Sequence, residues 1–529
     1  MTRPLLFTNG IIHTLDSATP SADAVLIGTD GRIAFVGLEH EIGSLPPDTQ
    51  RIDLAGRTLI PGFNDAHVHI WKLGLLLTVQ VDARGAAAPS IEAIQDRFHA
   101  RAAQVPPGTW LTGRGYNEAS LPELRHPTAA DLDLAAPAHP VALTRTCGHM
   151  IVANSLALRL ANITAETPDP PGGVIVRAAD GTPTGLLQET AMGLLTRAIP
   201  DVGDDTMANA IRAAMTHQLR LGITSATDPL LTPLHMRVYH LLEARGDLTV
   251  RVNGLPIRRP DGGTDTLPLP EKYLSDTLRV DCVKFFADGG LSGATAAISQ
   301  PYKVTGTRGV LRFDDDELFE LMLEAHANGF RIATHAIGDV ALEQVIRTYE
   351  RLHAAKPLPL RHRIEHLGLP AEGHLARCRA LQVIAVPQTV FLPALGDTYR
   401  RYLPDAFFPR CYPVRSMIDA GLTVAFSSDA PVVPDDNPLL GIKAALDRKD
   451  PFGEPIAPAE AITAYEALYA YTMGGAIASG DHANRGSISV GKWGDVAILS
   501  GDPLTTPADV LPSLRVEQTV VGGRLAWEG

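Results

Sequence analysis

The sequence predicts an α/β protein: a (β/α)8, TIM-like barrel with a small β-sandwich domain built from both termini. Three observations favour this fold. Helices and strands alternate between about residues 310 and 475, which is typical of parallel strands joined by crossover helices. Short strands separated by turns occupy both ends of the chain. Histidine, lysine and aspartate residues stand where successive strands end, and in a barrel these ends form one mouth.

The two ends of the chain share a β-rich pattern. Strands are expected at residues 11–15, 24–27 and 33–36, with turns at Asn9-Gly10 and at residues 29–31, and again at 495–499 and 517–521. One composite β-sandwich domain, residues 1–60 plus 480–529, accounts for both ends. Two unrelated β-extensions are the alternative.

The middle of the chain, residues 61–479, is expected to be the barrel. At 529 residues the chain exceeds a single small domain, whereas an α/β barrel can use about 250 residues or more as one unit. Predicted helices cover 314–328, 339–353, 375–381 and 414–420; predicted strands cover 222–226, 250–253, 282–286, 330–335, 362–366, 383–386 and 422–426. No GxGxxG phosphate loop follows any of these strands, which disfavours an open doubly wound sheet. Residues 75–210 fit this rhythm poorly, so we expect an insertion there that acts as a lid or substrate-binding region.

Composition narrows the class of function. The 46 Lys and Arg against 59 Asp and Glu give a net charge of −13, which argues against nucleic acid as a partner. No run of about 18 apolar residues indicates a membrane span. The four cysteines form no CxxC pair, as expected in a reducing compartment. We therefore expect a cytoplasmic protein without a membrane partner, with a homo-oligomer left open.

The pair His67-x-His69 is the first candidate for chemistry. It follows the apolar run of residues 57–60, and residues i and i+2 of a strand point to the same face. Two converging imidazoles suit a divalent metal such as zinc. Such a pair also arises by coincidence, so the case depends on further ligands.

Later strand ends supply those ligands: Lys284, His335, His366 and Asp429. Each has a simpler interpretation, because a histidine at a strand end can hydrogen-bond the next loop and Ser428-Asp429 can form a turn or a helix cap. Their occurrence at successive strand ends favours one shared site.

These motifs together resemble the amidohydrolase superfamily of metal-dependent hydrolases. More narrowly, the chain is similar to the amidohydrolase-3 (YtcJ-like) branch, which includes N-substituted formamide deformylase. The resemblance runs nearly end to end, through residues 59–63, His67-x-His69, 283–289, His335-x-x-Gly338-Asp339, Glu365-His366, Ser428-Asp429 and 491–495.

The resemblance implies a role for each ligand. His67 and His69 would hold the first metal and His335 and His366 the second. Asp429 would bind the first metal and also transfer protons. Lys284 would be carboxylated by carbon dioxide and bridge two divalent ions, since an ammonium has no lone pair. An unmodified Lys284 would leave a single-metal site, and Cys282, on the same strand face, is an alternative ligand less favoured than a buried core residue.

The implied activity is that of a metal-dependent amidohydrolase with zinc as the expected cofactor. Metal-bound water, with its pKa lowered to about 7, would attack the carbonyl of a linear amide such as an N-acyl or N-formyl amine. Hydrolysis of a cyclic amide, carbamate or ester, and a metal-dependent lyase or isomerase reaction, are alternatives. A binding protein without metals is disfavoured, because the ligand set is complete.

Residues that would contact a small-molecule substrate are less defined. The candidates are Trp71, Tyr116, Asn117, His149 and Gln388, with Arg114 in the same loop as Tyr116. Ordinary packing explains each of them equally well. Glu365 and Asp339 are expected to orient ligands or to cap helices.

Overall fold

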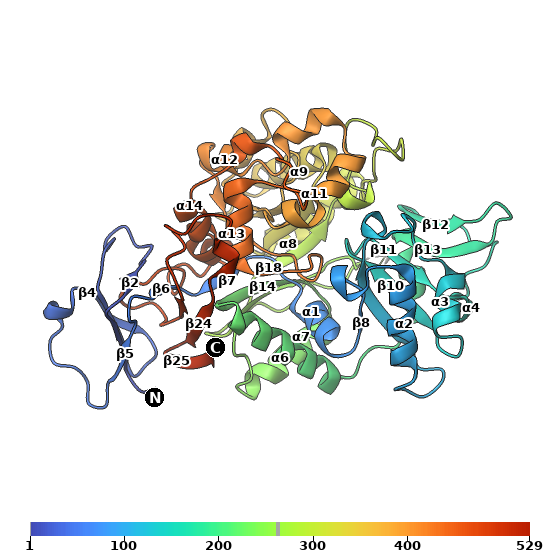
Figure 1. Ribbon diagram of the computed structural model, residues 1–529. Coiled ribbons are helices and arrows are strands. Elements are labelled where there is room, and N and C mark those ends of the chain that lie inside the picture. The colour runs from blue at the N-terminus through green and yellow to red at the C-terminus, as the bar shows by residue number, and fades with distance from the viewer. Residues whose placement is uncertain (1, 261–264) are drawn as a thin grey trace.

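A computed structural model describes residues 2–260 and 265–529 (Figure 1). Its centre consists of two mostly parallel sheets, ordered β16-β17-β15-β14-β7 and β18-β19-β20-β21-β22. The parallel strands are β7 (Phe63–Asp65), β14 (Ile223–Leu231), β15 (Arg251–Pro256), β17 (Leu278–Val280), β18 (Cys282–Phe286), β19 (Arg331–Ala336), β20 (Arg363–His366), β21 (Ile384–Val386) and β22 (Thr423–Val424). β16 (Tyr273–Leu274) adds an antiparallel edge.

Backbone contacts join the two sheets on both sides. Ile257, which follows β15, pairs in parallel with Lys284 of β18, and the amide of Arg258 donates to the Lys284 carbonyl at 3.1 Å. On the other side, the Ala66 amide donates to the carbonyl of Phe426 at 3.1 Å, and the Asp429 amide donates to the carbonyl of His67 at 2.7 Å. The ends of β7 and β22 are therefore held together directly.

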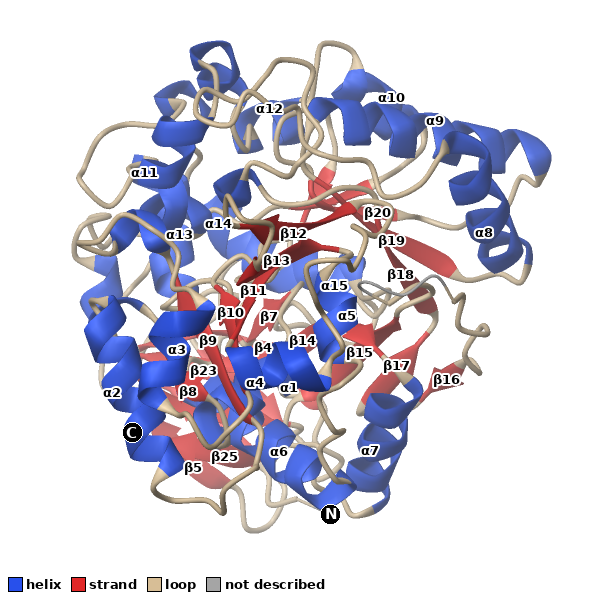
Figure 2. Ribbon diagram, turned by 90° about the vertical axis from the view of Figure 1, so that its right-hand side faces the viewer, coloured by secondary structure: helices blue, strands red, loops and turns tan. Residues whose placement is uncertain are grey.

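Helices connect the parallel strands and cover their outer side (Figure 2). They include α6 (Asp204–Arg220), α7 (Pro233–Ala244), α8 (Asp315–Ala327), α9 (Asp339–Ala355), α10 (His374–Ala380), α12 (Val414–Asp419) and α13 (Pro438–Asp447). The α8 boundaries follow from its sequence. Asp314 caps the first turn by accepting hydrogen bonds from the amides of Asp316 and Glu317, and Gly329, just beyond the helix, has a φ of +75°.

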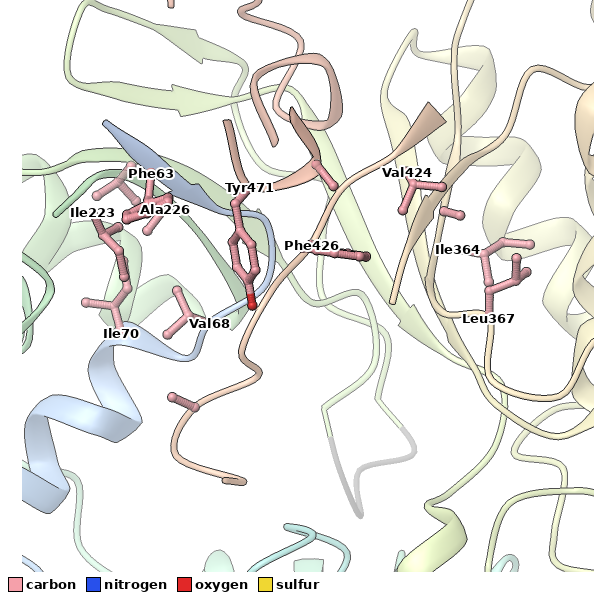
Figure 3. Packing of buried hydrophobic residues seen from close by; sticks show 14 of the residues in the cluster. Phe63, Val68, Ile70, Ile223, Ala226, Ile364, Leu367, Val424, Phe426 and Tyr471 are labelled. Atoms are coloured by element: carbon pink, nitrogen blue, oxygen red, sulfur yellow. The ribbon is translucent and has the colours of Figure 1, made fainter. Parts of the chain in front are cut away.

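One hydrophobic core links the two sheets (Figure 3). Phe63 of β7 and Phe426 beyond β22 both contact the ring of Tyr471 edge-on, with centroid distances of 6.2 and 5.4 Å. Ile223 of β14 and Ile364 of β20 belong to the same cluster. The strands that carry the candidate ligands are thus anchored in shared apolar packing.

The two ends of the chain meet in the terminal sheets. One sheet has the order β4-β3-β1-β5 and the other β2-β6-β23-β24-β25. Their strands are β1 (Leu5–Thr8), β2 (Ile11–Ile12), β3 (Ala24–Ile27), β4 (Ile33–Gly37), β5 (Gln50–Asp53), β6 (Thr58–Pro61), β23 (Val496–Leu499), β24 (Val516–Val521) and β25 (Arg524–Glu528). N-terminal β6 pairs antiparallel with C-terminal β23, and Phe7, Val25, Ile498 and Val520 share one apolar cluster. Figure 1 shows the N-terminal sheet beside the C-terminal strands.

The strand expected at residues 11–15 is shorter than predicted. It spans only Ile11–Ile12, because the chain turns directly afterwards. The Thr14 hydroxyl donates to the carbonyl of Thr19 at 2.6 Å, and Leu15 has a φ of 51°, outside the strand conformation. The strands expected at 24–27 and 282–286 are confirmed.

Residues between β7 and β14 form a separate sheet with the order β12-β13-β11-β10-β9-β8. Its strands are β8 (Val81–Asp82), β9 (Leu111–Tyr116), β10 (Val141–Arg145), β11 (Met150–Ala153), β12 (Gly173–Arg177) and β13 (Pro183–Glu189). Helices α2 (Ile91–Ala102), α3 (Ala129–Ala135), α4 (Ser155–Leu160) and α5 (Met192–Thr196) accompany it. This unit has an apolar cluster of its own that includes Phe98, Leu132 and Val152. None of the described helices is long and apolar enough to cross a membrane.

Helix α1 (Ile70–Thr78), which begins directly after His69, packs closely against α6. A Cβ atom at Gly74 would lie 2.0 Å from the carbonyl oxygen of Ala210. We expect Gly74→Ala to destabilise the protein by about 1–3 kcal/mol, because the two helices must separate. Thermal unfolding measures this, with Gly43→Ala as control, since nothing lies within 4 Å of a Cβ atom at Gly43. Equal midpoints for the two variants would contradict the expectation.

Candidate metal centre

The predicted ligands meet in one buried pocket. A cavity of about 30 Å³ is lined by His67, His69, His335, His366 and Asp429, together with Lys72, Arg114, Cys147, Gly148, His149, Phe286 and Val432. Lys284 lies beside this pocket: its side chain is fully buried, and its Nζ is 4.7 Å from the centroid of the Phe286 ring.

The side chains converge closely enough to share an ion. Ligand atoms of His67, His366 and Asp429 all lie within 4.8 Å of one another. The Nε2 atoms of His69 and His67 lie 3.2 and 3.4 Å from Asp429 Oδ1. The ring centroids of His335 and His366 are 4.4 Å apart.

His67 is oriented by a buried ion pair. Its Nδ1 hydrogen-bonds Glu365 Oε2, and Arg363 holds the same carboxylate through contacts of 2.6 and 2.9 Å. Burial raises the pKa of Glu365, but the charges of Arg363 and His67 outweigh it and hold the pKa well below its usual range. An Nδ1–H bond to this carboxylate leaves the His67 Nε2 lone pair facing the pocket.

His366 and His335 are oriented by neutral acceptors. His366 Nδ1 lies 2.6 Å from Gln388 Oε1, whose amide nitrogen donates to the Val386 carbonyl and the Ser427 hydroxyl at 2.9 and 2.8 Å. His335 Nε2 donates to the Gly289 carbonyl at 3.1 Å. Burial lowers the pKa of His366 to about 3 and that of His335 well below 6.5. Both rings are therefore neutral and present a lone pair, as metal ligands must.

The backbone on either side of the His67–Asp429 contact is anchored by Asp65. The Asp65 carboxylate accepts the amide and hydroxyl of Ser428 at 3.1 and 2.6 Å and the amide of His67 at 3.1 Å. Burial raises the pKa of Asp429, but His67 and His69 outweigh it, so the pKa stays well below 3.8 and the group is a carboxylate.

This donor set fits a divalent cation. Burial and the charge of Lys284 lower the pKa of His67, yet the carboxylates of Asp429 and Glu365 raise it overall. The space between the His67 and Asp429 side chains therefore favours a positive charge, and imidazole nitrogens with a carboxylate are ligands that zinc accepts. Cys282 is not among the residues that line this pocket: it packs with Leu255 and Ala333, and burial raises the pKa of its thiol to about 12.

The predicted substrate contacts divide into two groups. His149 lines the metal pocket, Gln388 hydrogen-bonds the His366 ring, and Trp71 lines a larger neighbouring cavity. Tyr116 and Asn117 face the interior of the inserted unit and are absent from the lining of both cavities. Tyr116 bonds His126 at 3.0 Å, and Asn117 accepts from Arg145 at 3.2 Å.

Three residues near the site were not predicted from the sequence: Glu189, Arg312 and Asp65. Glu189 Oε2 lies 3.0 Å from His149 Nδ1 and 2.8 Å from an Arg312 nitrogen, so it orients the His149 ring toward the pocket. Burial raises the pKa of Glu189, but His149 and Arg312 outweigh it and bring the pKa to about 2. Its position at the end of β13 was a usable signal, since the other site residues also stand at strand ends.

Comparison with known proteins agrees with this geometry. The model of the amidohydrolase family matches residues 50–526. The chain belongs to the amidohydrolase family.

Relatives of this amidohydrolase cover its full length. It is 32% identical to the putative amidohydrolase YtcJ of Bacillus subtilis, over 99% of each chain. It is 31% identical to N-substituted formamide deformylase of Arthrobacter pascens, over 99% of this chain and 98% of that one. The crystal structure of an uncharacterized metal-dependent hydrolase from Pyrococcus horikoshii superposes with a TM-score of 0.76 at 26% identity, covering 96% of this chain and 99% of that one. The resemblance inferred from the motifs is confirmed, and the chain is a metal-dependent hydrolase acting on carbon–nitrogen bonds.

The variant Glu365→Gln tests whether the Glu365 carboxylate fixes the tautomer of His67. The amide keeps the shape but loses the charge that fixes the His67 tautomer, so we expect metal affinity to fall about 10–100-fold. Competition with a chromogenic chelator measures this. Glu343→Gln is the matched control, because Glu343 is 42% exposed and pairs with Arg377 on the surface. Unchanged metal affinity in Glu365→Gln would contradict the assigned support.

Proposed function

We propose that this amidohydrolase cleaves linear amides, N-acyl or N-formyl amines, with two divalent ions, zinc in the first instance. The observation that carries the proposal is the convergence of His67, His69, His335, His366 and Asp429 on one buried pocket. The similarity to N-substituted formamide deformylase supports a linear amide as the substrate. We further propose that the two central sheets form a (β/α)8 barrel, and that residues 1–60 and 480–529 form a composite β-sandwich.

His67, His69 and Asp429 would hold the first ion, and His335 and His366 the second. Carboxylated Lys284 would bridge them. The burial of Lys284 supports this, because a buried ammonium is costly and a carbamate would replace its positive charge with a negative one. The charge of unmodified Lys284 also lowers the pKa of His67, His335 and His366, which supports a position close to all three rings.

Bound divalent ions would lower the pKa of water and polarise the substrate carbonyl. Asp429 would accept the proton of the attacking water and deliver it to the leaving nitrogen, as a general base and then acid. His149, oriented by Glu189 and Arg312, faces the same pocket and would position the amide by hydrogen bonding. Gln388 would act on His366 alone, since its amide is engaged within the fold.

Asp429→Asn tests the proton transfer. The amide cannot serve as a base, so we expect kcat to fall about 10²–10⁴-fold on N-formyl and N-acyl amines. Steady-state kinetics at saturating zinc, with metal content measured in parallel, separates lost chemistry from lost metal. Asp435→Asn is the control, because Asp435 is exposed and caps a local turn. A metal-loaded wild-type enzyme that hydrolyses cyclic amides or esters but no linear amide would overturn the proposal.

Lys284→Ala tests the bridge. We expect the variant to bind one ion where the wild type binds two, since the bridging carboxylate is lost, and to lose most of its activity. Short carboxylic acids should restore part of the activity by occupying the vacated space. Elemental analysis and kinetics measure both effects. Two ions and full activity in Lys284→Ala would rule the bridge out.

A further inference from the structure

A short segment after β18 contacts both the backbone and the ring of His335. The Ala287 amide donates to the His335 carbonyl at 2.8 Å. The Gly289 carbonyl accepts from His335 Nε2 at 3.1 Å. Between these two contacts stands Asp288, whose side chain is fully buried. Whatever fixes Asp288 therefore also fixes how this segment meets His335.

The Asp288 carboxylate binds three backbone amides from two other segments. Its Oδ1 accepts from Ile337 at 3.1 Å, and its Oδ2 accepts from Gly338 and from Ala297, each at 2.9 Å. Asp288 Oδ1 also lies 3.5 Å from His335 Nε2. Burial raises the pKa of Asp288 to about 7, and the three amides oppose this shift because they stabilise the charged form. The carboxylate thus joins the end of β18 to the turn that follows His335.

The rest of the loop after β18 is anchored independently of Asp288. Arg145, fully buried at the end of β10, donates to the hydroxyl and the carbonyl of Ser292 at 3.2 and 3.0 Å. The Thr295 hydroxyl accepts from the Gly290 amide at 3.0 Å. The loop should therefore keep its path when the Asp288 side chain is changed, so that a substitution there acts locally.

We propose that Asp288 is a positioning residue for the second metal ion: it holds the Gly289 carbonyl against His335, so that the His335 ring keeps one orientation and one tautomer. This inference rests on the proposed function for the ion that His335 would bind, whereas the orientation of the ring stands on hydrogen bonds within the chain. Loss of a hydrogen-bonding group that orients a metal ligand typically lowers metal affinity about 10–100-fold.

The variant Asp288→Asn tests this role. The amide keeps the shape of the side chain but replaces one acceptor oxygen with a donor, which must face the amide of Ile337 or those of Gly338 and Ala297. We expect the second ion to bind about 10–100-fold more weakly and the first ion to bind as in the wild type. Stepwise titration of the metal-free protein with cobalt(II), followed by visible absorption and chelator competition, measures the two affinities at a pH above the pKa of Asp288.

Nuclear magnetic resonance of the metal-free protein tests the ring itself. With isotopically labelled histidine, the wild type should show His335 as a single neutral tautomer protonated at Nε2, because Nε2 donates to the Gly289 carbonyl. The Asp288→Asn spectrum should show a mixture of the two neutral tautomers. The His335→Asn variant identifies the signal by its disappearance. A residue that only stabilised the fold would leave this tautomer unchanged.

The matched control is Asp450→Asn. Asp450 is also buried and also accepts two backbone amides, from Phe452 and Glu454 at 2.9 Å each, but it is absent from the lining of the metal pocket. This variant should keep both metal affinities and the His335 tautomer of the wild type. Thermal unfolding compares the stability lost in the two variants.

A milder variant, Thr295→Val, decides the question if Asp288→Asn fails to fold. Valine keeps the shape of threonine but cannot accept the hydrogen bond from the Gly290 amide, next to Gly289. We expect the second ion to bind more weakly than in the wild type, in the same direction as in Asp288→Asn, with the first ion unaffected.

The outcomes separate this inference from the proposed function. An unchanged His335 tautomer in Asp288→Asn, equal weakening of both ions, or the same effects in Asp450→Asn would overturn the inference. If the wild type binds only one ion, the proposed two-ion site fails and the tautomer alone decides the role of Asp288. Selective loss of the second ion from Asp288→Asn, in an enzyme that hydrolyses no linear amide, would support the inference and overturn the proposed substrate class alone.

Discussion

The buried ion pair between Arg363 and Glu365 connects the central strand β20 to the His67 side chain of the candidate metal centre. Both residues lie on β20 and are fully buried, and the Arg363 guanidinium also donates to the Ala66 carbonyl at 2.5 Å, next to His67. Glu365 in turn fixes the His67 ring. Removing one partner would leave an uncompensated buried charge, at a cost of about 3–5 kcal/mol. The pair therefore ties β20 to the chain beyond β7 and sets a ligand tautomer at the same time.

Backbone conformation aims the remaining ligands. His366, Leu367 and Asp429 have φ values of 74°, 46° and 57°, in the left-handed region that non-glycine residues seldom adopt. Each such residue costs about 1–3 kcal/mol unless its surroundings impose the conformation. Here they do: Gln388 holds the His366 ring, Leu367 packs in the core, and Asp65 holds Ser428. The strain is located where the chain leaves a strand and must turn a side chain into the pocket.

Parallel strands of a barrel bring their carboxyl ends to one mouth, and this rule explains how much of the site the sequence could predict. His67, His335, His366 and Asp429 were selected because each follows or ends an apolar run whose direction the rule supplies, whereas Lys284 lies inside β18. Tyr116 and Asn117 were selected by their loop, but loop position gives no side-chain direction, and both face the inserted unit. The contact of Glu189 with Arg312 spans 123 residues and joins an insertion to the central sheets. No periodicity within either segment encodes that contact.

The metal pocket and the neighbouring cavity differ greatly in size, at about 30 and 630 Å³. The metal pocket holds about 30 Å³, enough for the reacting groups but not for the body of a substrate. The neighbouring cavity of about 630 Å³, whose lining comes mainly from α1, α7 and the inserted unit, offers room for a larger group. The ligands are therefore constrained by the geometry of parallel strand ends, whereas the cavity lining can change without disturbing them. We therefore expect specificity to depend on the segment that departs most from the regular alternation of strands and helices.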